Sequence, residues 1–258
     1  CNRYVDIALR AGTGFILESP TWRCSKGWGA KLGHEEDAVA RFNREAIELL
    51  ADLRRRTGTA NPVVISGCVG PRGDGYVPEG LMTPPEAEDY HRHQIGVFAE
   101  TDADMVTAVT MNYAAEAIGI ASAAKARAIP AAISFTLEPD GRLPSGQPLH
   151  EAIREVDAAT DAAPAYYMIN CAHPDHFAHI LHDDGSGWTS RIYGLRANAS
   201  RKSHAELDAS ETLDDGNPEE LGRDYATLAR ALPNLAVFGG CCGTDHRHVD
   251  AIARYCCR

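Results

Sequence analysis

Apolar residues in this chain gather in short runs that are separated by longer stretches with helical spacing. The runs are mostly apolar rather than alternating, which is typical of parallel strands buried on both faces. They predict strands at 14–19, 62–69, 104–110, 131–136, 165–171, 191–195 and 235–240. The stretches with helical spacing predict helices before the first run and at 36–56, 85–100, 114–128 and 219–231. Residues 137–149 and 182–189 are rich in Gly, Pro or Asp and predict loops.

Alternating strands and helices predict a parallel α/β sheet with right-handed crossovers. A closed (β/α)8 barrel needs one strand more than the seven expected here. We therefore expect a TIM-type barrel that lacks its first strand in this chain, a strand that would precede Cys1. An open doubly wound sheet is the alternative, but no G-x-G-x-x-G motif opens an early helix. No linker is visible, so residues 1–258 are expected to form a single domain.

Charge and cysteine content narrow the class of protein. The chain has 25 basic and 36 acidic residues, a net charge of −11, which disfavours nucleic acid and anionic membranes as partners. No apolar run approaches the roughly 20 residues that span a bilayer, and no secretory signal is visible. Eight cysteines in a chain of 258 residues are expected to be reduced thiols in a cytoplasmic protein, with metal binding or catalysis as their uses. The oligomeric state is not indicated.

Polar and sulfur-bearing residues gather where the predicted strands end, which is where barrel enzymes carry their chemistry. The clearest example is GGCCGT, in which Cys241 and Cys242 follow a predicted strand among glycines. Neighbouring side chains on a strand point to opposite faces, so a sharp turn is needed to bring both sulfurs together, and the glycines permit it. Cys171 ends another predicted strand that opens into the same barrel mouth. The alternative is that all three are small buried apolar residues.

Three thiolates that converge on one ion favour zinc, since soft sulfur ligands select it. A set of three protein ligands leaves a fourth position open, as in catalytic zinc sites. Zinc with three thiolates has a net charge of −1 and is a poor Lewis acid, but a thiol that binds it is deprotonated. Because the thiolate is the reactive form of sulfur, such a site suits alkylation of a substrate thiol better than hydrolysis.

Other candidate residues divide between function and structure. Glu18 closes an apolar strand, where a carboxylate without a partner is costly, and His173 lies beside a predicted ligand. For Cys68 the functional and structural interpretations are balanced. The pairs His91-x-His93 and His246-x-His248 lie in stretches with helical spacing, where residues i and i+2 do not share a face. They are therefore interpreted as solvated helix surface.

Four segments give the chain a family resemblance: ISGCVGPRGDGY, AAISFTLEPDGRLPSGQPL, MINCAHP and GGCCGTDHRHV. With them the chain resembles the homocysteine S-methyltransferase family of zinc-dependent barrels. The resemblance implies that Cys171, Cys241 and Cys242 are the zinc ligands. It also implies that homocysteine binds zinc as a thiolate and attacks the methyl group of a sulfonium, quaternary ammonium or folate donor, forming methionine. No protein residue is then the nucleophile.

The chain departs from the family pattern at three places. It has no Asp-Gly-Gly turn on a first strand, and Val109-Thr110 stands where the family often has Glu-Thr. Ala197-Asn198 stands where Pro-Asn is frequent. We therefore expect Glu18, Thr110 and Asn198 to orient the substrate. Two alternatives stay open, namely a zinc-thiolate methyltransferase for another thiol or a selenol, and an inactive zinc-binding barrel.

Overall fold

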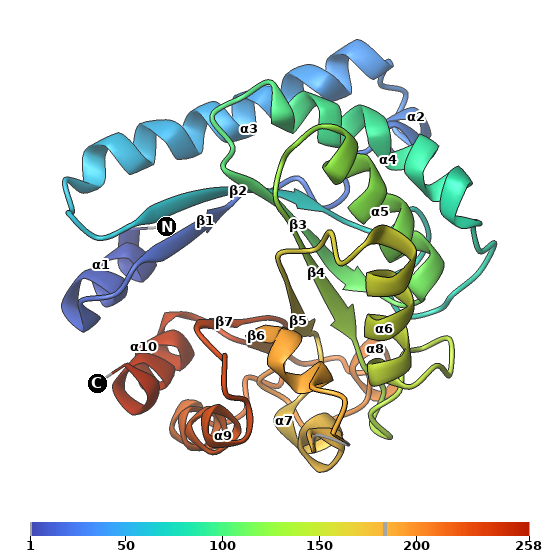
Figure 1. Ribbon diagram of the computed structural model, residues 1–258. Coiled ribbons are helices and arrows are strands. Elements are labelled where there is room, and N and C mark those ends of the chain that lie inside the picture. The colour runs from blue at the N-terminus through green and yellow to red at the C-terminus, as the bar shows by residue number, and fades with distance from the viewer. Residues whose placement is uncertain (1, 183–184, 258) are drawn as a thin grey trace.

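The computed structural model describes residues 2–182 and 185–257 and contains one sheet of seven parallel strands (Figure 1). The strands are hydrogen-bonded in the order in which they occur in the chain. They are β1 (Phe15–Glu18), β2 (Val63–Val69), β3 (Met105–Met111), β4 (Ala131–Thr136), β5 (Tyr166–Asn170), β6 (Ile192–Ala197) and β7 (Val237–Gly240). Each lies within one or two residues of the run that predicts it.

Helices lie on the outside of the curled sheet and connect its strands (Figure 1). The larger ones are α1 (Asn2–Ala11), α3 (Glu36–Thr57), α4 (Pro84–Ala99), α5 (Ala114–Ala126), α6 (Leu149–Thr160), α9 (Pro218–Ala231) and α10 (His246–Cys256). Shorter ones are α2 (Lys26–Lys31), α7 (Pro174–Phe177), α8 (His204–Asp208) and the 3-10 turns η1 (Ala178–Ile180) and η2 (Trp188–Arg191). Of the loop predicted at 182–189, residues 183 and 184 lie outside the described residues.

The sheet curls but does not close. The first and last strands, β1 and β7, form its two edges and are not hydrogen-bonded to each other. Near this opening, α1 packs against α10, and Arg10 forms an ion pair with Asp250 at 2.7 Å. The expectation of a barrel with one strand missing is therefore confirmed as a curled parallel α/β sheet, while a closed barrel is not observed.

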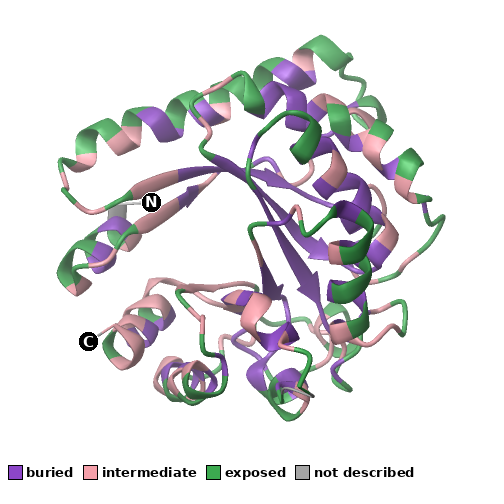
Figure 2. Cartoon of the chain, viewed as in Figure 1, coloured by how far each residue is buried: buried purple, intermediate pink, exposed green. Residues whose placement is uncertain are grey.

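The two faces of the sheet have different side chains. On β4, Ile133 and Phe135 belong to the apolar core under the helices, while Ser134 alternates with them on the inner face. On that inner face the Ser134 hydroxyl donates to Asn170 Oδ1 at 2.6 Å, and the hydroxyls of Ser66 and Thr107 lie 2.7 Å apart. Figure 2 shows the central strands buried throughout. The hydroxyls of Ser66, Thr107 and Ser134 on the inner face thus have hydrogen-bond partners, as burial favours.

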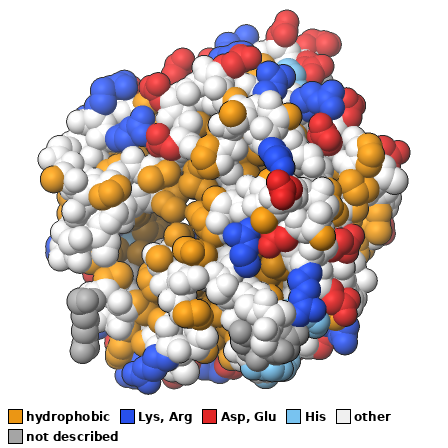
Figure 3. Space-filling model, in the orientation of Figure 1, with side chains coloured by type: hydrophobic (Ala, Val, Ile, Leu, Met, Phe, Trp, Pro, Cys, Tyr) orange, Lys and Arg blue, Asp and Glu red, His pale blue; other side chains and the backbone are white. Residues whose placement is uncertain are grey.

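The outer surface mixes acidic and basic side chains, and one face is hollowed near its middle, where apolar side chains line the depression (Figure 3). In the part of the chain that the structure describes, no helix has the length and apolarity needed to cross a membrane.

Candidate metal centre

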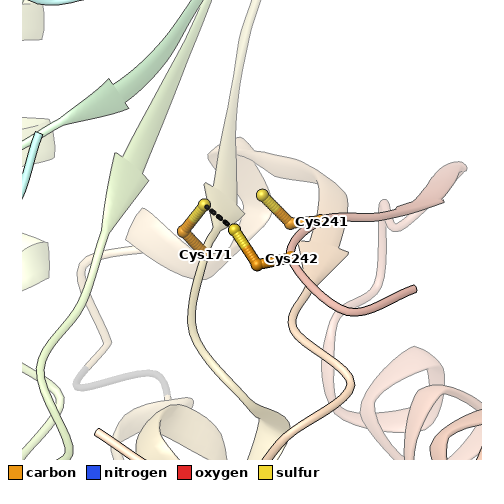
Figure 4. Close-up of side chains that lie close together, drawn as sticks. All are labelled: Cys171, Cys241 and Cys242. Atoms are coloured by element: carbon orange, nitrogen blue, oxygen red, sulfur yellow. Dashed lines mark hydrogen bonds between the residues drawn. The ribbon is translucent and has the colours of Figure 1, made fainter. Parts of the chain in front are cut away.

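Three cysteine sulfurs converge at the carboxyl ends of β5 and β7 (Figure 4). Cys171 follows β5, and Cys241 and Cys242 follow β7. Their Sγ atoms all lie within 4.8 Å of one another, and those of Cys171 and Cys242 are 3.9 Å apart. A tetrahedral ion with sulfur ligands at about 2.3 Å holds neighbouring sulfurs about 3.8 Å apart. The separation of Cys171 Sγ and Cys242 Sγ matches this spacing, and the three sulfurs together lie close enough to share one ion.

The backbone turns sharply at each cysteine-bearing strand end. Cys171 has φ of 53°, a left-handed conformation that is uncommon for a residue other than glycine. After β7, the N–H of Cys241 donates to Ala197 O at 2.8 Å, and Ala199 N donates to Cys242 O at 3.0 Å. Gly243 has φ of 76° and allows the chain to leave this turn. These constraints present both adjacent sulfurs to Cys171.

The three thiols influence each other's ionisation. Hydrogen bonds with Cys171 and Cys241 lower the pKa of Cys242 to about 2. Hydrogen bonds with Cys171 and Cys242, together with burial, raise the pKa of Cys241 well above its usual value. Hydrogen bonds between the thiols therefore favour a thiolate within the cluster. A metal that binds all three sulfurs has to displace the remaining protons.

Two side chains that sequence reasoning did not select hold Cys171 in place. The hydroxyl of Tyr76, in the segment between β2 and α4, donates to Cys171 Sγ at 3.4 Å. His204, the first residue of α8, has its Nε2 2.5 Å from Cys171 O and its Nδ1 3.2 Å from Glu138 Oε1. The rings of Tyr76 and His204 pack with centroids 4.3 Å apart. Tyr76 is the last residue of the ISGCVGPRGDGY motif, so this motif could have indicated its role. No motif in the sequence analysis includes His204.

The segment that carries Tyr76 is tied to the mouth of the sheet. Arg23 Nη1 donates to Pro71 O at 3.0 Å and to Gly73 O at 2.7 Å. Asn112, just after β3, donates to Asp74 O at 2.9 Å. These bonds fix the backbone on both sides of the bend, so the tyrosine hydroxyl is directed to the cysteines without a regular element to support it.

The predicted substrate-orienting residues lie at strand ends but have different surroundings. Asn198 accepts a hydrogen bond from Cys242 N at 3.1 Å and lines a cavity beside the cysteines. Thr110 has φ of 65°, and its Oγ1 accepts from Asn170 Nδ2 at 2.9 Å. Glu18 forms an ion pair with Arg196 on the inner face. Thr110 and Glu18 do not line that cavity.

The remaining candidates lie outside the trio. His173 is buried, which lowers its pKa to about 4, and its Nδ1 accepts from Asp175 N at 3.2 Å at the start of α7. Cys68 is buried at the end of β2. The seven described cysteines are all free, and Cys1 lies outside the described residues.

A cavity of about 340 Å³ opens beside Cys242. Tyr76, Cys242 and Leu213 line it together with carboxylates from the segment that follows α8 and from α8 itself. Its acidic residues are Asp208, Glu211 and Asp214. A small molecule in this cavity would contact Cys242 and lie near these three carboxylates.

Comparison with known proteins supports one family. A family model described as Homocysteine S-methyltransferase matches residues 6–256. The chain is 25% identical over 271 residues to Homocysteine S-methyltransferase 3 of Arabidopsis thaliana, covering 95% of this chain and 77% of that protein. It is 27% identical over 270 residues to Betaine--homocysteine S-methyltransferase 1 of Bos taurus. That match covers 95% of this chain but only 61% of the cattle protein.

Solved structures share the fold. The oxidized form of the homocysteine methyltransferase MmuM from Escherichia coli superposes with a TM-score of 0.78 and 19% identity, covering 98% of this chain and 82% of that chain. The metallated form of the same protein gives a TM-score of 0.76 with 18% identity, covering 98% and 83%. At this level of identity the likeness establishes a common architecture.

Proposed function

Because the chain belongs to the homocysteine S-methyltransferase family and is an S-methyltransferase, we propose that it methylates the thiol of homocysteine, forming methionine, with zinc held by Cys171, Cys241 and Cys242. The convergence of three sulfurs within 4.8 Å is the observation that carries this proposal. Zinc bound there would supply a positive charge that favours the deprotonated form of an incoming thiol.

The protein's own residues prepare the site. Tyr76 and His204 fix the side chain and the carbonyl of Cys171, and Asn198 fixes the backbone of Cys242. Preset ligand directions reduce the conformational entropy that metal and substrate binding would otherwise cost. Outer hydrogen bonds of this kind typically change metal affinity or activity by about 10- to 100-fold. We also keep Glu18, Thr110 and Asn198 as groups that orient the substrate.

The methyl donor is proposed to be a cation that binds in the cavity beside Cys242. Asp208, Glu211 and Asp214 line this cavity, so a sulfonium or quaternary ammonium group is favoured there over an anionic donor. In the reaction, the substrate sulfur forms a bond to the methyl carbon while the bond from that carbon to the onium atom breaks. The bonding electron pair leaves with a neutral sulfide or amine, and the proton of the thiol goes to solvent.

A second candidate acceptor is another thiol or a selenol. The buried side chain of Val109 lies at the end of β3, where it offers no hydrogen-bond acceptor for an ammonium group. An acceptor without an amino group is compatible with this position. We also propose that residues 1–258 form a single domain built on this one sheet.

The proposal is tested by assaying zinc-loaded protein with homocysteine and one donor of each class, a sulfonium, a quaternary ammonium and a methylated folate. Mass spectrometry is expected to detect methionine with at least one cationic donor, and removal of zinc by a chelator is expected to abolish the product. Cys171→Ser should behave like the metal-free protein, whereas Cys256→Ser, outside the cluster, should retain activity. Product formation that is unaffected by zinc removal would contradict the proposal.

A further inference from the structure

An ion pair lies on the inner face of the sheet, next to the cysteine cluster. Arg196 is on β6, between the strand that leads to Cys171 and the strand that leads to Cys241. Its carbonyl oxygen accepts a hydrogen bond from Cys171 N at 3.2 Å. Its side chain reaches Glu18 on β1, at the far edge of the sheet. The pair therefore links β1, one edge of the opening, to β6, the strand next to the other edge.

Strand register places both charged groups inside. Arg196 is in register with Asn170, whose amide bonds Ser134 on the inner face. Residues in register on adjacent parallel strands point to the same side of a sheet. The residues that precede the two charged residues, Leu195 and Leu17, both belong to the apolar core under the helices. The two charged side chains consequently project away from the helices and into the interior.

The ion pair has unused hydrogen-bonding capacity. An arginine has five N–H donors. Within the described residues, Arg196 uses Nη1 toward Glu18 and Nε toward Gly240 O at 3.5 Å, and no acceptor faces Nη2. Glu18 uses only Oε2. The side chains of Arg196 and Glu18 are 29% and 19% exposed, so neither is fully enclosed by the protein.

Partial burial of two charged groups costs free energy even when they form an ion pair. The neighbouring positions on the inner face carry neutral side chains. The inner faces of β2 and β3 present Ser66, Thr107 and Val109. A homocysteine molecule has an ammonium and a carboxylate on its α-carbon, and each needs an opposite charge when it leaves water. Adjacent strands are about 4.8 Å apart, so the Arg196 backbone lies about one strand spacing from each cysteine-bearing strand. That distance is comparable to the few bonds between the sulfur and the α-carbon of homocysteine.

We propose that Glu18 and Arg196 form the binding site for the amino acid group of the acceptor, with Glu18 binding its ammonium and Arg196 its carboxylate. This inference rests on the proposed function, because the acceptor's sulfur has to lie at the cysteine cluster. Glu18 thereby provides an anionic partner for the acceptor's ammonium, which the apolar side chain of Val109 cannot provide. It makes an α-amino acid, rather than a simple thiol, the preferred acceptor.

The acceptor itself provides the first test. Calorimetric titration of the zinc-loaded protein compares homocysteine with 4-mercaptobutanoate, which lacks the ammonium, and 3-mercaptopropylamine, which lacks the carboxylate. Each truncated thiol is expected to bind about tenfold to a hundredfold more weakly than homocysteine, the usual effect of losing a charge-assisted hydrogen bond. This comparison needs no variant and therefore does not depend on a substitution being tolerated.

Variants then assign each charge to its residue. Arg196→Gln should bind homocysteine and 3-mercaptopropylamine with equal affinity. Arg196→Lys, which keeps a positive charge, should restore most of the preference for homocysteine. Glu18→Gln should make homocysteine and 4-mercaptobutanoate bind equally. The matched control is Arg191→Gln, which breaks an ion pair with Asp157 at 2.9 Å near the start of β6 and should leave all affinity ratios unchanged.

The possible outcomes separate this inference from the proposed function. If the wild-type protein binds the three thiols equally, or if the ratios survive in both Glu18→Gln and Arg196→Gln, the inference is wrong while the methyltransferase proposal stands. If the zinc-loaded protein binds no thiol, or binds thiols equally well after zinc removal, the proposed function fails and the inference fails with it.

Discussion

At the scale of single residues, the site depends on a tyrosine that no regular element supports. Tyr76 donates its hydroxyl hydrogen bond to Cys171 Sγ at 3.4 Å and packs its ring on His204. Burial and the charge of Cys171 raise the pKa of Tyr76, so its hydroxyl stays protonated and acts as a donor. A donor aimed at a thiolate stabilises the negative charge that a ligand sulfur carries.

Replacing Tyr76 with phenylalanine is expected to weaken zinc binding by about tenfold or more, because the ring packing stays while the hydrogen bond to Cys171 is lost. Zinc affinity is measured by competition with a chromophoric chelator. The matched control is Tyr90→Phe, which removes a hydroxyl that lies 2.8 Å from Ser25 Oγ and does not contact the cysteines. Equal zinc affinity in Tyr76→Phe and wild type would show that the contact has no role in metal binding.

At the scale of elements, the turn that carries Cys241 and Cys242 is fixed by the start of α10. Asp245 is the N-cap, and its side chain accepts from Arg247 N at 2.8 Å. His248 completes the cap, since Asp245 N donates to its Nδ1 at 3.1 Å, and its Nε2 bonds Asp215 O at 2.8 Å. His248 is therefore buried, and its interpretation as solvated helix surface is wrong. His91 is likewise buried, 2.9 Å from Glu116, on the face of α4 that packs against α5.

The N-cap predicts a pH-dependent stability. Partial burial acts to raise the pKa of Asp245, but hydrogen bonds from the backbone N–H and the guanidinium of Arg247 outweigh it and lower the pKa to about 2. The folded protein thus keeps this carboxylate ionised at pH values where the unfolded chain protonates it, near 3.8. Its stabilisation is present in full well above pH 4 and is lost as the pH falls toward 2.

Asp245→Ala is expected to reduce the free energy of unfolding by about 1 kcal/mol at pH 7, the usual cost of removing an N-cap. The difference from wild type should narrow between pH 4 and pH 2, as measured by thermal unfolding. Asp245→Asn keeps a cap that does not ionise, so its stability should lack this contribution to the pH dependence. A gap between wild type and Asp245→Ala that stays constant down to pH 2 would contradict the assignment.

At the scale of the whole molecule, the sequence predicts the strands well because each is a compact, mainly apolar run, and β3 and β4 are buried throughout. It also predicts Cys171, Cys241 and Cys242, because parallel strands bring their carboxyl ends to one end of the sheet. The Glu18–Arg196 pair was not predicted, since it depends on how far the sheet curls. Tyr76 and His204 depend on irregular segments whose path the hydrophobic pattern does not specify. The strand pattern therefore predicts the framework and the converging cysteines, but not the side-chain contacts between distant strands.

The central claim is that the three cysteines bind one zinc ion and leave a place for a substrate sulfur. X-ray absorption at the zinc edge of the purified, zinc-loaded protein tests it most directly. We predict three sulfur neighbours per zinc at about 2.3 Å, and four after homocysteine is added. Fewer than three sulfurs in the protein alone, or an unchanged sulfur count with saturating homocysteine, would contradict the account.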